Sequence, residues 1–457
     1  MSAVRLFCAP AEQAELLIRG AHVLDPRARI DEPLDVLVRR GAIARLAAPG
    51  TLEAQDATEV VQGAGLHLFP AFVDIHVHLR TPGQEHKETI ETGTAAAAAG
   101  GYCAVVAMPN TDPTVDCTAV LGSLIEQARS RARVPVGFLA AITRGLEGRE
   151  LTEMAQLRRQ GAIGFTDDGR PVTSAGLLRR ALQYQRVCGG VVALHEEDPT
   201  LSQDGVMHEG PVSARLGLAG IPSLSESTMV ARDGALALLE GARVHFQHLS
   251  CAESVQALQT LRQRGARVSA EVTPHHLTLT DEEVRTLDSR MKCNPPLRRD
   301  ADRRALVEGL RSGVIECVAT DHAPHAAHEK RVPFEQAPMG TTGLETAFSA
   351  IYTELVAPGE LELETLVERM SAGARLYDLP EPRIGLGKPA NLCLVDLRAS
   401  FRAGEDGYAS RSDNCAFHGR TLRGRVLMTI AGGSVAFRRP VLAAAGAQSA
   451  LEPAARR

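Results

Sequence analysis

The stretch LHLFPAFVDIHVHL, residues 66–79, is mostly apolar and ends with His76 and His78 two positions apart. It is the first of eight short apolar runs that alternate with longer segments of helical pattern. Strands alternating with helices are typical of parallel βα units, and eight units over about 300 residues predict a (β/α)8 TIM-like barrel, which we place at residues 66–382. The other seven runs are YCAVVAMPN (102–110), VPVGFLAAI (134–142), AIGFTDD (162–168), GVVALHEED (190–198), RVHFQHLS (243–250), RVSAEVTPHH (267–276) and VIECVATDH (314–322).

Both chain ends carry short alternating segments instead. Residues 1–65 include ELLIRGAHVLD and DVLVRRGAIARL, and residues 383–438 include ANLCLVDL and RVLMTIAGGSVAF. Such alternation between Gly and Pro turns is typical of antiparallel strands. We expect the two ends to form one small β-sandwich domain. Residues 439–457 lack apolar periodicity, and we expect a flexible tail there.

The composition excludes several classes of protein. Of the 457 residues, 44% are hydrophobic and 23% are charged, which excludes a mainly disordered chain. The formal net charge of −5 gives no electrostatic support for a nucleic-acid partner. No apolar run is long enough to span a bilayer. The nine cysteines form no CxxC pair, as expected for reduced thiols, so we expect a cytoplasmic protein. From the net charge and the lack of a long apolar run we expect neither a nucleic-acid nor a membrane partner.

The histidine pair at the end of the first run points to chemistry. Side chains on a strand alternate with period two, so His76 and His78 share one side of the strand. On a barrel strand that side is the lumen, and the carboxyl ends of barrel strands are where such enzymes place their active sites. Two imidazoles that converge in a closed site suit a bound metal ion, but the motif alone equally suits a pair of partly exposed histidines at a strand end.

Other runs bring similar residues to the same rim. The fourth run ends in Asp167 and Asp168, the fifth reaches His195, the sixth reaches His248 and the eighth reaches Asp321. Each residue alone is typical of a polar loop. Together with the first pair they form a ligand set that suits zinc or a similar ion.

Several motifs resemble those of the dihydroorotases in the amidohydrolase superfamily. They are PAFVDIHVHLRTPGQEHKETIETGTAAAAAGG, AMPNTDPTVD, GFTDDGRPV, ATDHAPH and GLETA, and the similarity extends over nearly the whole chain. The resemblance implies a metal-dependent barrel beside a small β-sandwich. It also implies reversible hydrolysis of dihydroorotate to N-carbamoyl-aspartate, a step of pyrimidine biosynthesis.

The resemblance also implies roles for the rim residues. His76 and His78 would hold one zinc ion, His195 and His248 a second, and Asp321 would bind the first ion and carry the proton. Many relatives bridge the two ions with a carboxylated lysine at the end of strand four. No lysine lies there in this chain, and the segment GFTDDG resembles a bacterial subgroup with an aspartate at this place. Asp168 fits the spacing to His78 and His195 better than Asp167 does. The sequence leaves open whether the site holds one ion or two.

A second set of residues is implied for the substrate. Arg80 follows His78 by two positions and would face the lumen if the strand continued, where its guanidinium suits a carboxylate. From the residues alone, Arg80 equally suits a surface salt bridge with Glu85 or Glu88, and Asn110 equally suits a turn. The resemblance assigns the substrate contacts to His78, Arg80, Asn110, Asn294, His325, Met339 and Gly340.

Two alternatives stay open. A dihydropyrimidinase, hydantoinase or allantoinase shares the HxH motif and the last aspartate, but normally carries the bridging lysine and needs no carboxylate clamp. A non-catalytic barrel that scaffolds aspartate transcarbamoylase would normally lack metal ligands that are present here. From the sequence, a homo-oligomer remains possible, and so does an association of an active enzyme with aspartate transcarbamoylase.

Overall fold

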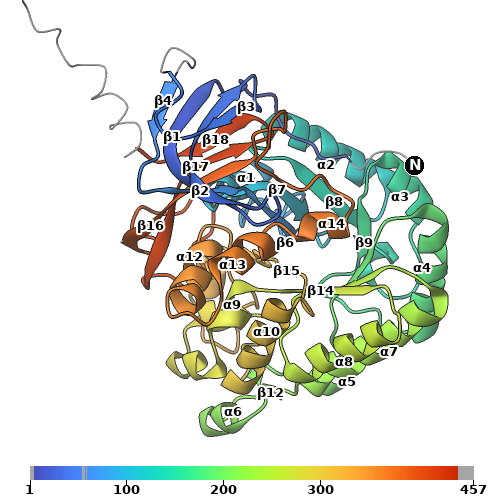
Figure 1. Ribbon diagram of the computed structural model, residues 1–457. Helices are drawn as coiled ribbons and strands as arrows, with labels where there is room; N and C mark the ends of the chain where they lie inside the picture. Colours follow the sequence, from blue (N-terminus) through green and yellow to red (C-terminus); the bar gives the residue numbers. More distant parts are fainter. Residues whose placement is uncertain (1–4, 54–56, 58, 441–457) are drawn as a thin grey trace, which may run out of the picture.

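The computed structural model describes residues 5–53, 57 and 59–440, and its centre is a parallel barrel (Figure 1). In the described part of the chain, eight parallel strands follow one another around the barrel in chain order. The ring closes where the backbone N–H of His78 donates to the carbonyl of His322 at 2.9 Å. The strands are β6 (Phe72–Val77), β7 (Tyr102–Ala107), β8 (Val136–Ala140), β9 (Gly164–Thr166), β10 (Val192–Leu194), β13 (Val244–Phe246), β14 (Val268–Val272) and β15 (Cys317–Val318).

Helices surround this ring, and capping residues in the sequence explain where they begin and end. In α4, Ser174 caps the first turn by accepting from the N–H of Leu177, and the helix stops before Gly189, whose φ of 76° suits glycine. Its apolar stripe, which includes Leu178 and Leu182, is buried against the barrel. The main outer helices are α1 (Ile90–Ala99), α2 (Thr118–Arg131), α3 (Met154–Gln160), α4 (Ala175–Cys188), α7 (Leu224–Glu240), α8 (Ala252–Gln263), α10 (Asp300–Ser312), α12 (Ala347–Ile351), α13 (Leu363–Arg369) and α14 (Gly373–Leu376).

Short helices and strands lie in the loops that connect the main elements. Among them are three 3₁₀ turns (Arg144–Leu146, Asp281–Thr286 and Ser289–Met291) and a π-helical turn (Tyr352–Val356) in the described residues. The remaining short pieces are α5 (Pro199–Ser202), β11 (Met207–His208), α6 (Pro211–Leu216), β12 (Gly220–Ile221), α9 (Pro274–Thr278) and α11 (Ala327–Lys330).

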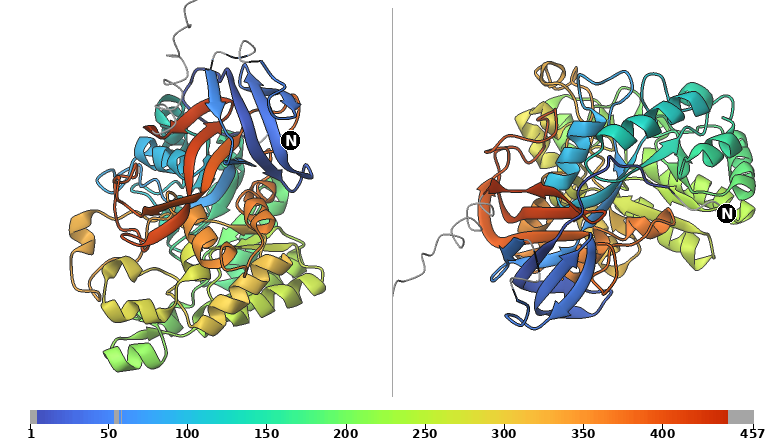
Figure 2. Two further views of the ribbon diagram at one scale, coloured as in Figure 1. Left: turned by 60° about the vertical axis from the view of Figure 1, so that its left-hand side comes forward. Right: turned by 90° about the horizontal axis from the view of Figure 1, so that it is seen from above.

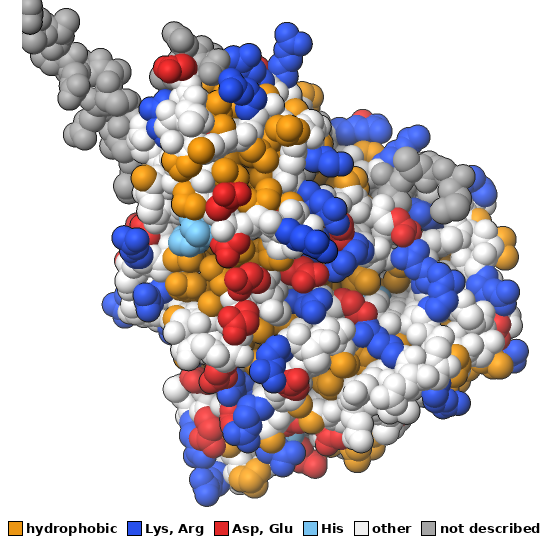
Figure 3. All heavy atoms as spheres, viewed as in Figure 1, with side chains coloured by type: hydrophobic (Ala, Val, Ile, Leu, Met, Phe, Trp, Pro, Cys, Tyr) orange, Lys and Arg blue, Asp and Glu red, His pale blue; other side chains and the backbone are white. Residues whose placement is uncertain are grey.

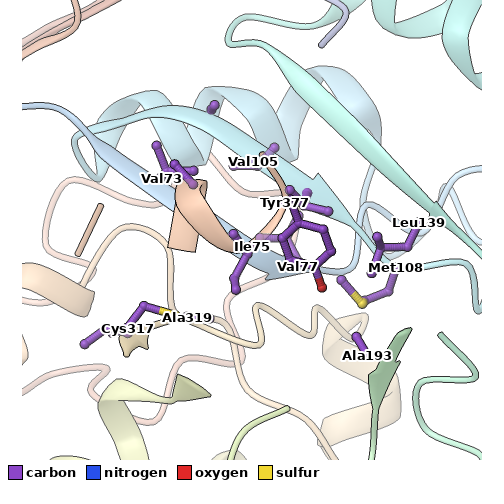
Figure 4. Packing of buried hydrophobic residues seen from close by; sticks show 14 of the residues in the cluster. Val73, Ile75, Val77, Val105, Met108, Leu139, Ala193, Cys317, Ala319 and Tyr377 are labelled. Carbon is purple, nitrogen blue, oxygen red and sulfur yellow. The ribbon is translucent and has the colours of Figure 1, made fainter. Parts of the chain in front are cut away.

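Side chains along β6 alternate between the helical layer and the barrel lumen. Ile75 faces the helical layer, because a Cβ added to Gly373 of α14 would lie 2.8 Å from Ile75 Cγ2. Figure 4 shows Val73, Ile75 and Val77 of this strand in the buried apolar cluster, together with Tyr377. The residues between them, which include His76, consequently face the lumen.

A second sheet is built from both chain ends, as Figure 2 shows beside the barrel. Its strands β1 and β2, β2 and β3, β16 and β17, and β17 and β18 pair antiparallel as expected, whereas β4 and β5 pair with β1 in parallel. These strands are β1 (Leu16–Asp25), β2 (Ile30–Arg39), β3 (Ala42–Ala47), β4 (Glu59–Gln62), β5 (His67–Pro70), β16 (Leu392–Arg402), β17 (Thr421–Ala431) and β18 (Ser434–Arg438).

The run at 66–79 therefore forms two strands rather than one. β5 joins the sheet of the chain ends between β1 and β16, and the chain enters the barrel only at Phe72. Both segments are apolar because both are buried, so hydrophobicity alone does not reveal the break. The tail expected at 439–457 lies, from residue 441 on, outside the described residues. No helix in the described part is long and apolar enough to cross a membrane.

Candidate active site

A cavity of about 240 Å³ opens at the carboxyl ends of the barrel strands. Asp321, three of the four candidate histidine ligands and all seven residues expected to contact substrate line its wall. The lining residues are His78, Arg80, Asn110, Asp168, Gly169, His195, His248, Asn294, Asp321, Ala323, His325, Met339 and Gly340. His76 lies directly behind this wall and is fully buried.

His76 is oriented by an acidic residue on β14, which is separated from β6 in the ring by β15 alone. Its Nδ1 lies 2.5 Å from Oε1 of Glu271, so Nδ1 carries a proton and Nε2 faces the cavity. That Nε2 lies 3.3 Å from Oδ1 of Asp168 and 3.5 Å from Oδ1 of Asp321. Burial alone would lower the pKa of His76, but the charges of Glu271 and Asp168 outweigh it and raise that pKa well above its ordinary value.

His78 is oriented in the same way by an amide. Its Nδ1 donates to Oδ1 of Asn110 at 2.8 Å, because that oxygen only accepts. Its Nε2 then faces Oδ1 of Asp321 at 2.9 Å and Oδ2 of Asp168 at 3.4 Å. The amide nitrogen of Asn110 donates to Oδ2 of Asp168 at 3.2 Å. Asn110 therefore positions two candidate ligands, and its donor is already used.

His195 and His248 form the other half of the cluster. Nε2 of His195 donates to Oε2 of Glu197 at 3.1 Å, which turns Nδ1 toward the cavity. This Nδ1 lies 2.9 Å from Nε2 of His248, and both nitrogens approach Oδ1 of Asp168, at 3.9 and 3.6 Å. Burial would raise the pKa of Glu197, but its contacts with His195 lower that pKa to about 2, so Glu197 is a carboxylate.

The two neighbouring aspartates have different surroundings. Asp167 accepts from the backbone N–H groups of Ile142 and Thr143 at 2.7 and 3.0 Å, which ties it to the end of β8. Asp168 lies among the histidines and contacts both halves of the cluster. Burial would raise the pKa of Asp168, but the charge of His76 and a hydrogen bond with His248 lower that pKa well below its ordinary value.

The donor set fits a metal ion. The ring nitrogen of His76 that faces two carboxylates is buried and has no hydrogen-bond partner in the described residues. Zinc bonds of about 2.05 Å in a tetrahedral site place the ligand atoms about 3.3 Å apart. The distances from His76 Nε2 to Asp168 and Asp321 and from His78 Nε2 to Asp168 are 3.3, 3.5 and 3.4 Å. Two such groups exist within the described ranges: His76, Asp168 and His248, and His76, His78 and Asp321.

A third group of similar residues, His275, His276 and Cys293, is less suited to a metal ion. Both ring nitrogens of His276 are engaged, with Thr273 at 2.8 Å and with the carbonyl of Pro295 at 3.0 Å. Burial also raises the pKa of the Cys293 thiol to about 12. A protonated thiol and a fully bonded imidazole are poor ligands.

Backbone strain accompanies three of the site residues. Arg80, His248 and Asp321 have φ values of 55°, 33° and 46°, a region that non-glycine residues rarely occupy. Such conformations concentrate at functional sites because the surrounding structure must hold them. Arg80 reaches the cavity through this turn and not through a continued strand, since β6 ends at Val77.

The residues expected to contact substrate differ in the donors that they still offer. Nδ2 of Asn294 donates to Glu197 at 2.7 Å, and Nε2 of His325 donates to the carbonyl of Met339 at 2.8 Å. Arg80 is buried, and its Nε donates to the carbonyl of Pro324 at 3.2 Å, which leaves both terminal nitrogens for a ligand. A surface salt bridge of Arg80 with Glu85 or Glu88 is absent from the described residues.

Two carboxylates of the site were not anticipated. Glu271 is buried in strand β14 and contacts His76 and His245, and Glu197 contacts His195 and Asn294. Glu271 is the one acidic residue in the apolar run RVSAEVTPHH, and Glu197 follows His195 by two positions, as Arg80 follows His78. A lone acid in an apolar strand is the signal that could have identified Glu271.

The chain is similar to known proteins over most of its length. A family model described as dihydro-orotase-like matches residues 65–254. A protein named dihydroorotase from Pelotomaculum thermopropionicum is 46% identical over 422 residues, which cover 92% of this chain and 98% of the relative. Another from Desulforapulum autotrophicum is 42% identical over 428 residues, 93% of this chain and 100% of the relative. The chain belongs to the dihydroorotase family.

Membership in the dihydroorotase family makes the chain an enzyme, a hydrolase that acts on cyclic amides. Solved structures show the same fold. An L-hydantoinase from Arthrobacter aurescens has a TM-score of 0.82 at 24% identity, with 92% of this chain and 96% of that chain covered. A dihydropyrimidinase from Brevibacillus agri NCHU1002 has a TM-score of 0.79 at 22% identity, with 93% and 95% covered. The expected barrel with a separate sheet from both chain ends is confirmed.

Proposed function

We propose that this member of the dihydroorotase family catalyses the reversible hydrolysis of (S)-dihydroorotate to N-carbamoyl-L-aspartate in pyrimidine biosynthesis. The observation that carries the proposal is the buried guanidinium of Arg80 on the wall of the cavity that also holds Asp321 and the histidine cluster. A cyclic amide that bears a carboxylate pairs with this guanidinium, whereas an uncharged ring leaves it without a partner.

The metal ion would be zinc, one or two per chain, because four imidazoles and two carboxylates form the donor set. His76, His78 and Asp321 would hold one ion, His195 and His248 the other, and Asp168 would contribute to both. When bound, zinc supplies a Lewis acid that polarises the amide carbonyl and lowers the pKa of water.

Asp321 would carry the proton. Burial would raise the pKa of Asp321, but contacts with His78 and His76 lower it to about 2, so the carboxylate is ionised and can accept a proton from the attacking water. The same carboxylate then donates that proton to the departing ring nitrogen. Because the nitrogen stays tethered to the product, the reverse closure benefits from a high effective molarity.

We place the enzyme in the cytosol. All nine cysteines, which lie within the described residues, are free thiols, and six of them are buried. A reducing compartment keeps such thiols unpaired.

The test is a comparison of substrates. The purified enzyme should hydrolyse dihydroorotate with a kcat/KM at least about 100-fold above that for dihydrouracil, which lacks the carboxylate. Preference for dihydrouracil would favour a dihydropyrimidinase-type activity, and hydrolysis of neither would favour a non-catalytic scaffold. Asp321→Asn should cut turnover of dihydroorotate by a factor of roughly 100 to 10,000, the scale of a lost acid–base group.

A further inference from the structure

A larger cavity lies at the opposite, amino-terminal end of the barrel. Its volume is about 660 Å³, against about 240 Å³ for the candidate active site. Its walls come from the segments that enter the strands: Gly161 precedes β9, Gly190 precedes β10, Arg243 precedes β13 and Arg267 precedes β14. The cavity thus shares no lining residue with the candidate active site.

Arginines surround this cavity, which we name the arginine cleft. Six of them line it: Arg5, Arg158, Arg159, Arg186, Arg243 and Arg267. Two come from a repeated tetrapeptide, GARV, at residues 241–244 and 265–268. Because Val244 and Val268 are aligned partners in the parallel pair β13–β14, Arg243 and Arg267 start adjacent strands side by side. In Figure 3, blue side chains outnumber red ones on the right of the molecule, below the grey atoms.

Most of the arginines of the cleft form no ion pair in the described residues, although the charge of Arg186 acts on nearby Glu240. Asp378, the one acidic residue of the lining, pairs with Arg243 at 2.9 Å, and Arg158 donates to the carbonyl of Ala162 at 2.6 Å. Arg5, Arg159, Arg186 and Arg267 make no ion pair within residues 5–53, 57 and 59–440. Nearby arginines on the same helical layer are paired, Arg179 with Glu240 and Arg262 with Glu316.

Helix ends account for only part of the excess. The helices α3, α4 and α7 all end at this cleft, and each carboxyl end corresponds to about half a negative charge. Three ends therefore offset about 1.5 of the net charge of +5 that six arginines and one aspartate give. A surplus of more than three positive charges remains for a ligand.

We propose that the arginine cleft binds a chain of phosphoryl groups, as in inorganic tripolyphosphate or a nucleoside triphosphate. Guanidinium forks pair with phosphate oxygens bidentately, and a single phosphate carries too little charge to satisfy the surplus. Four glycines of the lining, among them Gly161 and Gly190, leave the backbone open to close approach. The volume lies in the range of pockets for small molecules, which favours such a ligand over an acidic polypeptide.

The experiment is calorimetric titration of the full-length protein with sodium tripolyphosphate, ATP, inorganic phosphate and a hexaglutamate peptide at 0.15 M salt, an ionic strength chosen to screen weak surface attraction. Arg186→Ala and Arg267→Ala remove guanidiniums from the cleft. Arg180→Ala and Arg264→Ala are matched controls, because both are exposed arginines of the outer helical layer, in the middle of α4 and directly after α8, and neither lines the cleft. Heat from chelation of an active-site metal would be equal in all four variants.

We expect one tripolyphosphate per chain, a Kd at least about tenfold weaker in each cleft variant, and a Kd within about twofold of wild type in each control. Inorganic phosphate should bind at least tenfold more weakly than tripolyphosphate. Tighter binding of ATP would support the proposal with a nucleotide as ligand, and equal binding would support it with the phosphate chain alone. Absence of binding, equal losses in cleft and control variants, or tighter binding of a hexaglutamate peptide would overturn the proposal.

Discussion

Glu271 on β14 lies 2.5 Å from Nδ1 of His76 on β6, although the two residues are 195 positions apart in the chain. The contact decides which nitrogen of His76 faces Asp168 and Asp321. The second oxygen of Glu271 contacts Nε2 of His245 at 3.0 Å, so both carboxylate oxygens are engaged by histidines. A carboxylate behind a metal-binding imidazole orients the ring and strengthens it as a ligand.

Glu271→Gln should therefore weaken metal binding. An amide cannot supply the charge that raises the pKa of His76, and we expect metal affinity or kcat to fall by roughly 10- to 100-fold. Competition with a zinc chelator measures the affinity. Glu316→Gln is the matched control, because Glu316 accepts from the N–H of Ala270 on the same strand but touches no candidate ligand. Equal zinc affinity in both variants would remove Glu271 from this role.

Asp168→Asn and Asp167→Asn should change different properties: the first should lower the metal content and the second should lower the stability. The first variant loses a charge among the histidines, and we expect lower bound metal per chain with a small change in thermal stability. The second variant keeps its metal but perturbs the bonds to the N–H groups of Ile142 and Thr143, at a cost of about 1–3 kcal/mol in stability. Elemental analysis and thermal unfolding separate the two. A metal loss confined to Asp167→Asn would reverse the assignment.

Arg80→Ala should act on substrate binding. Loss of the guanidinium removes a charge-assisted pair, and KM for dihydroorotate should rise by at least about tenfold, with a much smaller change for dihydrouracil. Steady-state kinetics on both substrates measures this difference. Arg170→Ala, an exposed arginine next to Gly169 of the cavity, is the control and should change neither KM. Equal rises for both substrates would contradict a carboxylate contact.

Lys330 should make stability depend on pH. Burial lowers its pKa to about 7, against about 10.4 in an unfolded chain. Between these values the unfolded chain binds a proton that the folded chain does not, so a rise in pH through this window favours the folded state. The Tm of wild type relative to Lys330→Met should therefore increase from pH 7 to pH 9. Exposed Lys388→Met should show no such trend, and parallel curves for wild type and Lys330→Met would contradict the prediction.

The fold follows from the pattern of the chain to a large extent. Each of the eight apolar runs contains one barrel strand, and the helices α1, α3, α4 and α10 each end directly before a glycine, at positions 100, 161, 189 and 313. The break between β5 and β6 escaped prediction because both strands are buried on both faces, which removes the alternation that would separate them.

The site was harder to predict in its details. Strand periodicity explains why His76 and His78 converge, but Arg80 reaches the cavity through a turn with positive φ, which no strand pattern contains. Asn110 and His325 lie at the cavity as expected, yet their donors are bound to Asp168 and Met339. The first bond joins residues beyond the ends of β7 and β9, 58 positions apart, and the second joins two loop residues 14 positions apart, so no local sequence pattern reveals either.

We expect six side chains from five barrel strands to hold metal at one end of the barrel. Zinc-edge anomalous diffraction from crystals of the wild-type protein tests it most directly. We expect an anomalous peak in contact with His76, His78 and Asp321, with Asp168 in contact with this peak or with a second one at His195 and His248. Crystals grown with zinc that show no peak among these residues would contradict it.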